Sequence, residues 1–114
     1  MRVTSDLFVS ALLRRVFSSG GYGAVVNRGA FEAGAVFVTC RERTGDVVLY
    51  GPAAQASYDS ARPDERLFAE LMRGGDEAVG ARLDKERRFD PDIWIVEIEA
   101  GGETPETLLA ITKS

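Results

Sequence analysis

The chain has 114 residues, of which 45% are hydrophobic and 28% are charged, and its formal net charge is −4 at pH 7. This size and composition are typical of one globular domain and not of a disordered protein. The chain has no histidine and only one cysteine, Cys40. It therefore lacks the commonest general base and metal ligand, and every Ser–His or Cys–His catalytic pairing is excluded.

The sequence also predicts the cellular compartment of the protein. No apolar run approaches the roughly 20 residues that a membrane helix needs, and residues 1–17 lack the cleavage site of a secretory signal. A lone cysteine forms no internal disulfide and suits a reducing compartment. We therefore expect a cytoplasmic protein without membrane association. The net negative charge argues against general nucleic-acid binding.

An amphipathic helix is expected near the N-terminus. Thr4 or Ser5 is the predicted N-cap, and Asp6 lies in the first turn, where the helix dipole favours an acid. Gly20 offers a left-handed stop. Apolar residues recur at three- and four-residue spacing and form one wide stripe: Leu7, Phe8, Ala11, Leu12, Val16 and Phe17.

Strands of an antiparallel meander are expected next. Residues 22–27 and 35–40 are rich in β-branched side chains, and the loop over 28–34 between them is interpreted as a hairpin turn. Gly45 supplies a positive φ for the turn into a third strand over 47–50.

The following stretch leaves one alternative open. Residues 52–64 are rich in Ala, Ser, Pro and Asp and are expected to form a surface loop. Residues 66–72 fit either a short helix, because Gly74 follows them, or a fourth strand of the meander.

A second helix is predicted over residues 76–89. Asp76 is its expected cap, and Asp90 before Pro91 ends it, because a residue preceding proline avoids the helical region. Four-residue spacing predicts two surface ion pairs on this helix, Arg82–Glu86 and Asp84–Arg88.

The clearest strand is 93–99. Its alternation places Trp94, Val96 and Ile98 on one face, and Ile93, Ile95, Glu97 and Glu99 on the other. The core is expected to consist of the first helix packed on Val25, Val36, Val38, Val48, Trp94, Val96 and Ile98. Residues 100–114 are a polar tail in which 108–111 either docks as a short helix or stays flexible.

Seven charged residues are candidates for an interaction surface: Arg14, Arg15, Arg28, Glu32, Asp90, Asp92 and Glu97. No catalytic residue, metal ligand or cofactor is predicted. Asp90 and Asp92 fit a helix stop, Glu97 and Glu99 fit an exposed strand edge, and Cys40 fits a buried small hydrophobe. The alternative is a magnesium site, which requires at least three carboxylates within about 5 Å of a common point. A weaker third possibility is an anion- or RNA-binding patch of arginines: Arg14, Arg15, Arg28 and Arg41.

Several segments resemble one known family. They are 12–15 (LLRR), 26–29 (VNRG), 33–38 (AGAVFV) and, most specific of all, 88–99 (RFDPDIWIVEIE). Together they are similar to a small cytosolic alphaproteobacterial family, domain of unknown function 1491, over residues 7–99. Members often have Asp where this chain has Ala30, and the tail from Ala100 departs from the family. The resemblance implies a β-rich segment at 66–72 and so favours a strand there. It implies no reaction, because the family has no assigned activity.

We therefore predict one α+β domain over residues 1–114: a helix, an antiparallel meander of three or four strands, a second helix and a final strand joining the same sheet. The leading functional hypothesis is a small non-enzymatic interaction module. It would bind an unknown protein partner or a second copy of itself through an exposed sheet edge or an apolar patch. The alternative is a metal-dependent phosphoesterase or nuclease-like enzyme using Glu32, Asp90, Asp92 or Glu97.

Overall fold

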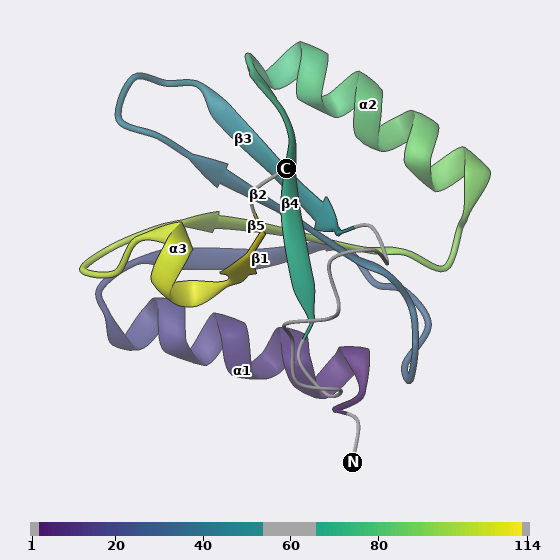
Figure 1. Ribbon diagram of the computed structural model, residues 1–114, viewed down its shortest axis with the longest axis horizontal. Helices are drawn as coiled ribbons and strands as arrows, with labels where there is room; N and C mark the ends of the chain where they lie inside the picture. Colours follow the sequence, from purple (N-terminus) through teal and green to yellow (C-terminus); the bar gives the residue numbers. More distant parts are fainter. Residues whose placement is uncertain (1–2, 54–65, 113–114) are drawn as a thin grey trace.

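A computed structural model describes residues 3–53 and 66–112, which form three helices and six strands in one sheet (Figure 1). In chain order the elements are α1 (Ser5–Ser18), β1 (Tyr22–Asn27), β2 (Val36–Arg41), β3 (Val47–Pro52), β4 (Leu67–Gly74), α2 (Asp76–Phe89), β5 (Trp94–Glu99), α3 (Pro105–Leu108) and β6 (Ala110–Ile111). The expected loop over 52–64 lies outside the described residues from position 54 onward. No helix of the described chain is long and apolar enough to cross a membrane.

The sheet is mixed, with the strand order β1-β5-β2-β3-β4-β6. The predicted antiparallel meander is correct only for β2, β3 and β4. Strand β5 lies between β1 and β2, antiparallel to the first and parallel to the second. The loop over 28–34 therefore connects β1 to β2, which are separated in the sheet by β5. Its interpretation as a hairpin turn was wrong.

The central place of β5 follows from its two apolar faces. Trp94, Val96 and Ile98 are buried on one face, and Ile95 is buried on the other together with Ile93, which directly precedes the strand. A strand that is apolar on both faces is stable only where both faces are covered.

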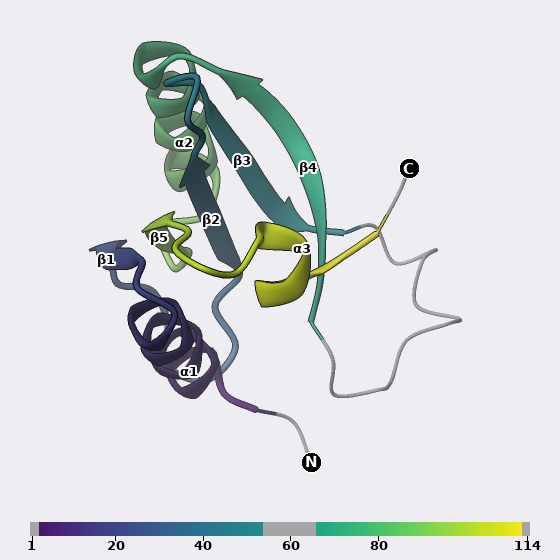
Figure 2. The ribbon, with the colours of Figure 1, turned by 90° about the vertical axis from the view of Figure 1, so that its left-hand side faces the viewer.

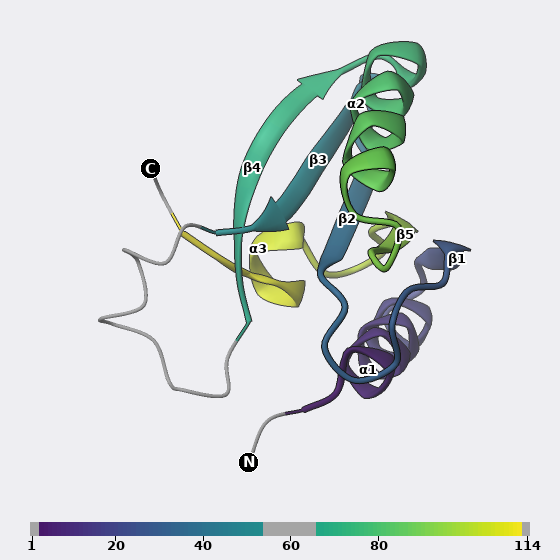
Figure 3. The same ribbon diagram turned by 90° about the vertical axis from the view of Figure 1, so that its right-hand side faces the viewer.

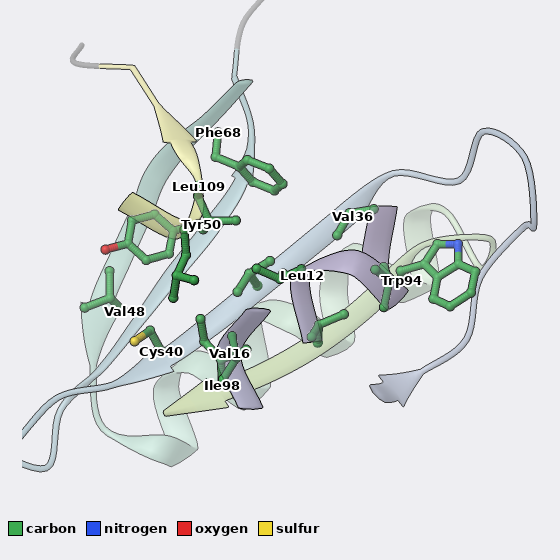
Figure 4. Close-up of a cluster of buried hydrophobic side chains, with 14 residues drawn as sticks. Leu12, Val16, Val36, Cys40, Val48, Tyr50, Phe68, Trp94, Ile98 and Leu109 are labelled. Carbon is green, nitrogen blue, oxygen red and sulfur yellow. The ribbon is translucent and has the colours of Figure 1, made fainter. Parts of the chain in front are cut away.

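Helices cover the two faces of the sheet unequally. α1 and α3 lie on one face, and α2 lies on the other (Figures 2 and 3). The core under α1 contains all the residues predicted for it, with Val25 partly buried at its margin; Figure 4 shows its centre around Leu12, Val16, Val36, Trp94 and Ile98. A second, smaller cluster lies under α2 and consists of Phe37, Val47, Leu49, Val79, Ile93 and Ile95.

Most of the predicted helix ends are confirmed. The hydroxyl of Thr4 caps α1 by accepting a hydrogen bond from the Leu7 amide at 3.1 Å, and Gly20 follows the helix with φ +87°. α2 has the predicted bounds, but Gly75 occupies its N-cap position and Asp76 lies in the first turn, so the prediction of Asp76 as the cap was wrong. The pair Arg82–Glu86 forms at 2.8 Å, whereas Asp84 pairs with Arg87 at 3.8 Å rather than with Arg88.

The ambiguous segment over 66–72 belongs to a strand, β4, which confirms the interpretation that the family resemblance favoured. Beyond β5 the chain returns across the sheet. Leu108 and Leu109 are buried against the core under α1, and Ala110–Ile111 pairs with Leu67–Phe68 of β4 as a short parallel strand. These residues after position 100 are thus part of the packed fold.

Candidate interaction surface

Four of the seven predicted site residues lie on two loops that contact each other at one end of the molecule. Arg28 and Glu32 belong to the loop after β1, and Asp90 and Asp92 belong to the loop before β5. The Ala30 amide donates to the Asp92 carbonyl at 2.9 Å, which joins the two loops. Both loops therefore occupy one site, although they are about 60 positions apart in the sequence.

Arg28 has structural partners in this site. Its guanidinium lies over the Trp94 ring, 5.2 Å from the centroid, and forms an ion pair with Asp6 at 3.3 Å. The Trp94 indole N–H donates to the Ala30 carbonyl at 2.8 Å. Such a cation–π contact contributes about 0.5–1 kcal/mol at an exposed site. Arg28 therefore stabilises the packing of the loop after β1 against the sheet.

The acidic residues of this site are explained by local structure. Asp90 is the C-cap residue of α2, and its side chain accepts a hydrogen bond from the Asp92 amide at 3.0 Å, so the predicted helix stop is confirmed. No group of three or more acidic or cysteine side chains in the described chain could share a metal ion. The requirement of the magnesium hypothesis is not met by Glu32, Asp90, Asp92 and Glu97.

The arginines do not form one patch. Arg15, at the end of α1, makes two hydrogen bonds to Glu103, at 3.0 and 2.7 Å. These bonds raise the pKa of Arg15 and lower the pKa of the Glu103 carboxyl. Arg41 pairs with Asp76 at 2.5 Å beside α2, on the other side of the sheet from α1. Arg15 and Arg41 are therefore each paired with a carboxylate, and they lie on opposite sides of the sheet.

The structure places Glu97 in a different environment from the one that the sequence predicted. Its assignment to an exposed strand edge was wrong, because β5 is an inner strand paired with both β1 and β2. The Glu97 side chain is half-buried and lines a groove between α2 and the uncovered part of the sheet. The groove has a volume of about 220 Å³. Its apolar lining is Val26, Val47, Val79, Leu83 and Ile95; Gly80, Thr39 and the Arg41–Asp76 pair complete it together with Glu97.

The groove, hereafter the α2 groove, exists because one helix covers only part of this face. α2 packs on β3 and β4, at the far side of the sheet from β1. Val26 of β1 is consequently 59% exposed on the same face. One feature of the sequence points to this groove. Gly80 lies inside the predicted second helix, where glycine is unfavourable.

Strand β1 forms the second unpartnered surface. No other strand of the described chain pairs with its outer side, so its backbone groups form an open edge. The six residues of β1 include no charge and no proline. Tyr22 is 54% exposed and packs edge-on against Phe17 of α1, with ring centroids 6.2 Å apart. A bulge at Val26 confines the regular register to Tyr22–Val25.

Cys40 is buried in the core under α1, as predicted, and burial raises the pKa of its thiol. Tyr50 lies in the same core (Figure 4), where burial raises its pKa from 10.0 to about 12. Neither group faces the α2 groove or the β1 edge, so both belong to the packing of the fold.

The buried Tyr50 predicts a loss of stability in alkali. Its folded-state pKa lies above its unfolded value, so the neutral phenol is favoured in the folded protein, and the stability it contributes is complete below pH 10 and lost as the pH rises towards 12. Urea unfolding between pH 8 and pH 11 measures this slope, and Tyr50→Phe should flatten it. An equal slope in both proteins would contradict the prediction.

The fold defines an α+β protein with one mixed six-stranded sheet and with no group of metal-binding side chains in its described part. The family model described as a protein of unknown function, DUF1491, matches residues 3–106, and the chain belongs to this family. The resemblance over 7–99 is thereby confirmed, and the expectation that the chain departs from the family at Ala100 was wrong, because the match continues to residue 106. No curated protein matches the chain.

Solved structures agree with the family assignment. A solution structure of a protein from A. tumefaciens is 46% identical, with a TM-score of 0.84 and coverage of 100% of this chain and 98% of that one. A crystal structure of a DUF1491 family protein from Caulobacter crescentus is 30% identical, with a TM-score of 0.77 and coverage of 96% and 99%. An NMR structure of a DUF1491 family protein from the same organism is 29% identical, with a TM-score of 0.78 and coverage of 99% of both chains.

Proposed function

We propose that this protein is a non-enzymatic interaction module that self-associates through the free edge of β1. The observation that carries the proposal is the unguarded character of this edge. Natural edge strands are often protected by charged residues or proline. Tyr22–Val25 contains neither and pairs with β5 in a regular register, which ends at the bulge at Val26.

The opposite side of the sheet is protected. There β6 pairs with Leu67 and Phe68 at the start of β4. Farther along β4, Arg73 forms ion pairs with Glu42 and Glu70. The contrast singles out β1 as the edge available to another strand.

Symmetry favours an antiparallel pairing of two copies. Antiparallel pairing of two β1 strands generates a two-fold symmetric contact, the commonest form of homodimer. The regular segment Tyr22–Val25 would then pair with the same segment of the second copy.

A lysine on this strand is expected to weaken the dimer. Light scattering after size-exclusion chromatography should show a dimer for the natural chain. Tyr22→Lys, at an exposed residue of the regular edge, should weaken the dimer at least about tenfold, which corresponds to about 1.4 kcal/mol, because the ammonium must be desolvated at the new interface. Ala78→Lys, at an exposed position of α2, is the matched control and should leave the dimer intact.

Two outcomes would refute the self-association. One is a natural chain that stays monomeric at several hundred micromolar. The other is a Tyr22→Lys variant with the same dimer population as Ala78→Lys. Circular dichroism of both variants verifies that each retains the fold.

A further inference from the structure

We propose that the α2 groove binds an amphipathic helix of a protein partner, with a Lys or Arg of that helix reaching Glu97. This inference goes beyond self-association, because it concerns the face of the sheet rather than its edge. It rests on the shape of the groove, on Gly80 and on the distribution of charge.

The shape of the groove leaves room for a second helix beside α2. Val79 and Leu83 of α2 and Ile95 of β5 form apolar walls, and the exposed Val26 forms the outer rim. Helices that pack side by side lie about 8–10 Å apart. A helix at that distance from α2 would cover the β1–β5 part of the sheet, which α2 leaves open in the described chain.

Gly80 favours close approach of such a helix. Glycine inside a helix costs about 1 kcal/mol relative to alanine. An added Cβ at Gly80 would meet no atom of the described chain within 4 Å, so packing within the fold does not require a glycine at this position. The bare backbone faces the groove, where it would let a partner helix approach α2 closely.

The charge of the groove identifies the chemistry of the partner. Arg41 is held by Asp76 and by the Gly45 carbonyl. Arg41 also interacts electrostatically with Glu97, so one arginine faces two carboxylates, Asp76 and Glu97, in the lining of the groove. Within the described residues the Glu97 side chain forms no ion pair as close as that of Asp76, and the groove has an excess of one negative charge. A cationic side chain beside an apolar stripe complements it.

Two synthetic helical peptides test this proposal. Both carry leucines at every third or fourth position; one has lysines beside the leucine stripe, and the other has glutamates at the same positions. Fluorescence anisotropy should show that the natural chain binds the lysine peptide about tenfold more tightly than the glutamate peptide. Glu97→Gln should remove this difference. Gly80→Leu should weaken the lysine peptide at least tenfold, whereas Ala78→Leu, at an exposed site on the same helix, should have no effect.

The outcomes are separable from those of the β1 edge. Gly80→Leu leaves β1 unchanged and should retain the dimer in light scattering, while Tyr22→Lys tests the dimer at a residue outside the lining of the α2 groove. A monomeric natural chain that binds the lysine peptide through Gly80 and Glu97 would support the groove and refute self-association. The groove proposal fails if the natural chain binds neither peptide, binds both equally, or is unaffected by Gly80→Leu.

Discussion

Replacing Gly29 by alanine is expected to destabilise the protein by about 3 kcal/mol, because the new Cβ has no space. It would overlap the Asp92 carbonyl oxygen and lie 2.6 Å from the Ile93 carbonyl oxygen. Both are backbone atoms at the start of β5, so neither can rotate away as a side chain would. Relief requires the loop after β1 to separate from β5, which would also break the hydrogen bond from Ala30 to Asp92.

Urea unfolding of Gly29→Ala measures this effect, and Gly80→Ala is its control. The control makes the same chemical change at a position where a Cβ meets open space, and it should raise stability by about 0.5–1 kcal/mol through helix propensity. Opposite signs at the two glycines would show that contact at Gly29 governs the first result. A Gly29→Ala variant as stable as the natural chain would show that the loop is not held against β5.

The local elements of this fold could be predicted because their signals lie within a few residues. Gly20 ends α1, and Asp90 before Pro91 ends α2, in each case where the sequence indicated. The face pattern of β5 likewise predicted which of its side chains meet α1. The order of the strands could not be predicted in this way, since Tyr22 pairs with Glu99 across most of the chain.

Pairing between distant strands also explains the failure at Glu97. Read along the sequence, Glu97 and Glu99 are polar residues of a strand near the chain's end, which suggests an exposed edge. Their environment is decided by the neighbouring strands β1 and β2 and by α2 on one face of the sheet, and the placement of these elements depends on tertiary packing. The α2 groove was missed for the same reason, because its lining residues come from five separate elements.

The family motifs coincide with this long-range packing. Segment 26–29 ends at Gly29, and segment 88–99 contains Asp92 and Trp94, to which the loop after β1 is fastened. The motifs that identified the family are thus explained by contacts of the fold.

Trp94→Ala is expected to cost about 4 kcal/mol, the typical effect of truncating a buried tryptophan. Trp94 is 1% exposed in the core under α1, and it also joins that core to the loop through the Ala30 carbonyl. A loss of this size is a large part of the 5–15 kcal/mol that stabilises a typical domain. Thermal unfolding followed by far-ultraviolet circular dichroism measures it without relying on the tryptophan signal.

Two further variants separate the contributions of Trp94. Trp94→Phe keeps an aromatic ring in the core but removes the N–H donor, so it should cost about 1–2 kcal/mol beyond any effect of the smaller ring. Phe89→Ala, at an aromatic residue that is 89% exposed, should change stability by less than about 0.5 kcal/mol. If Trp94→Phe were as stable as the natural chain, the indole hydrogen bond would not hold the loop. The destabilisation expected for Gly29→Ala would then have to come from steric overlap alone, because both variants act on the same contact between the loop and β5.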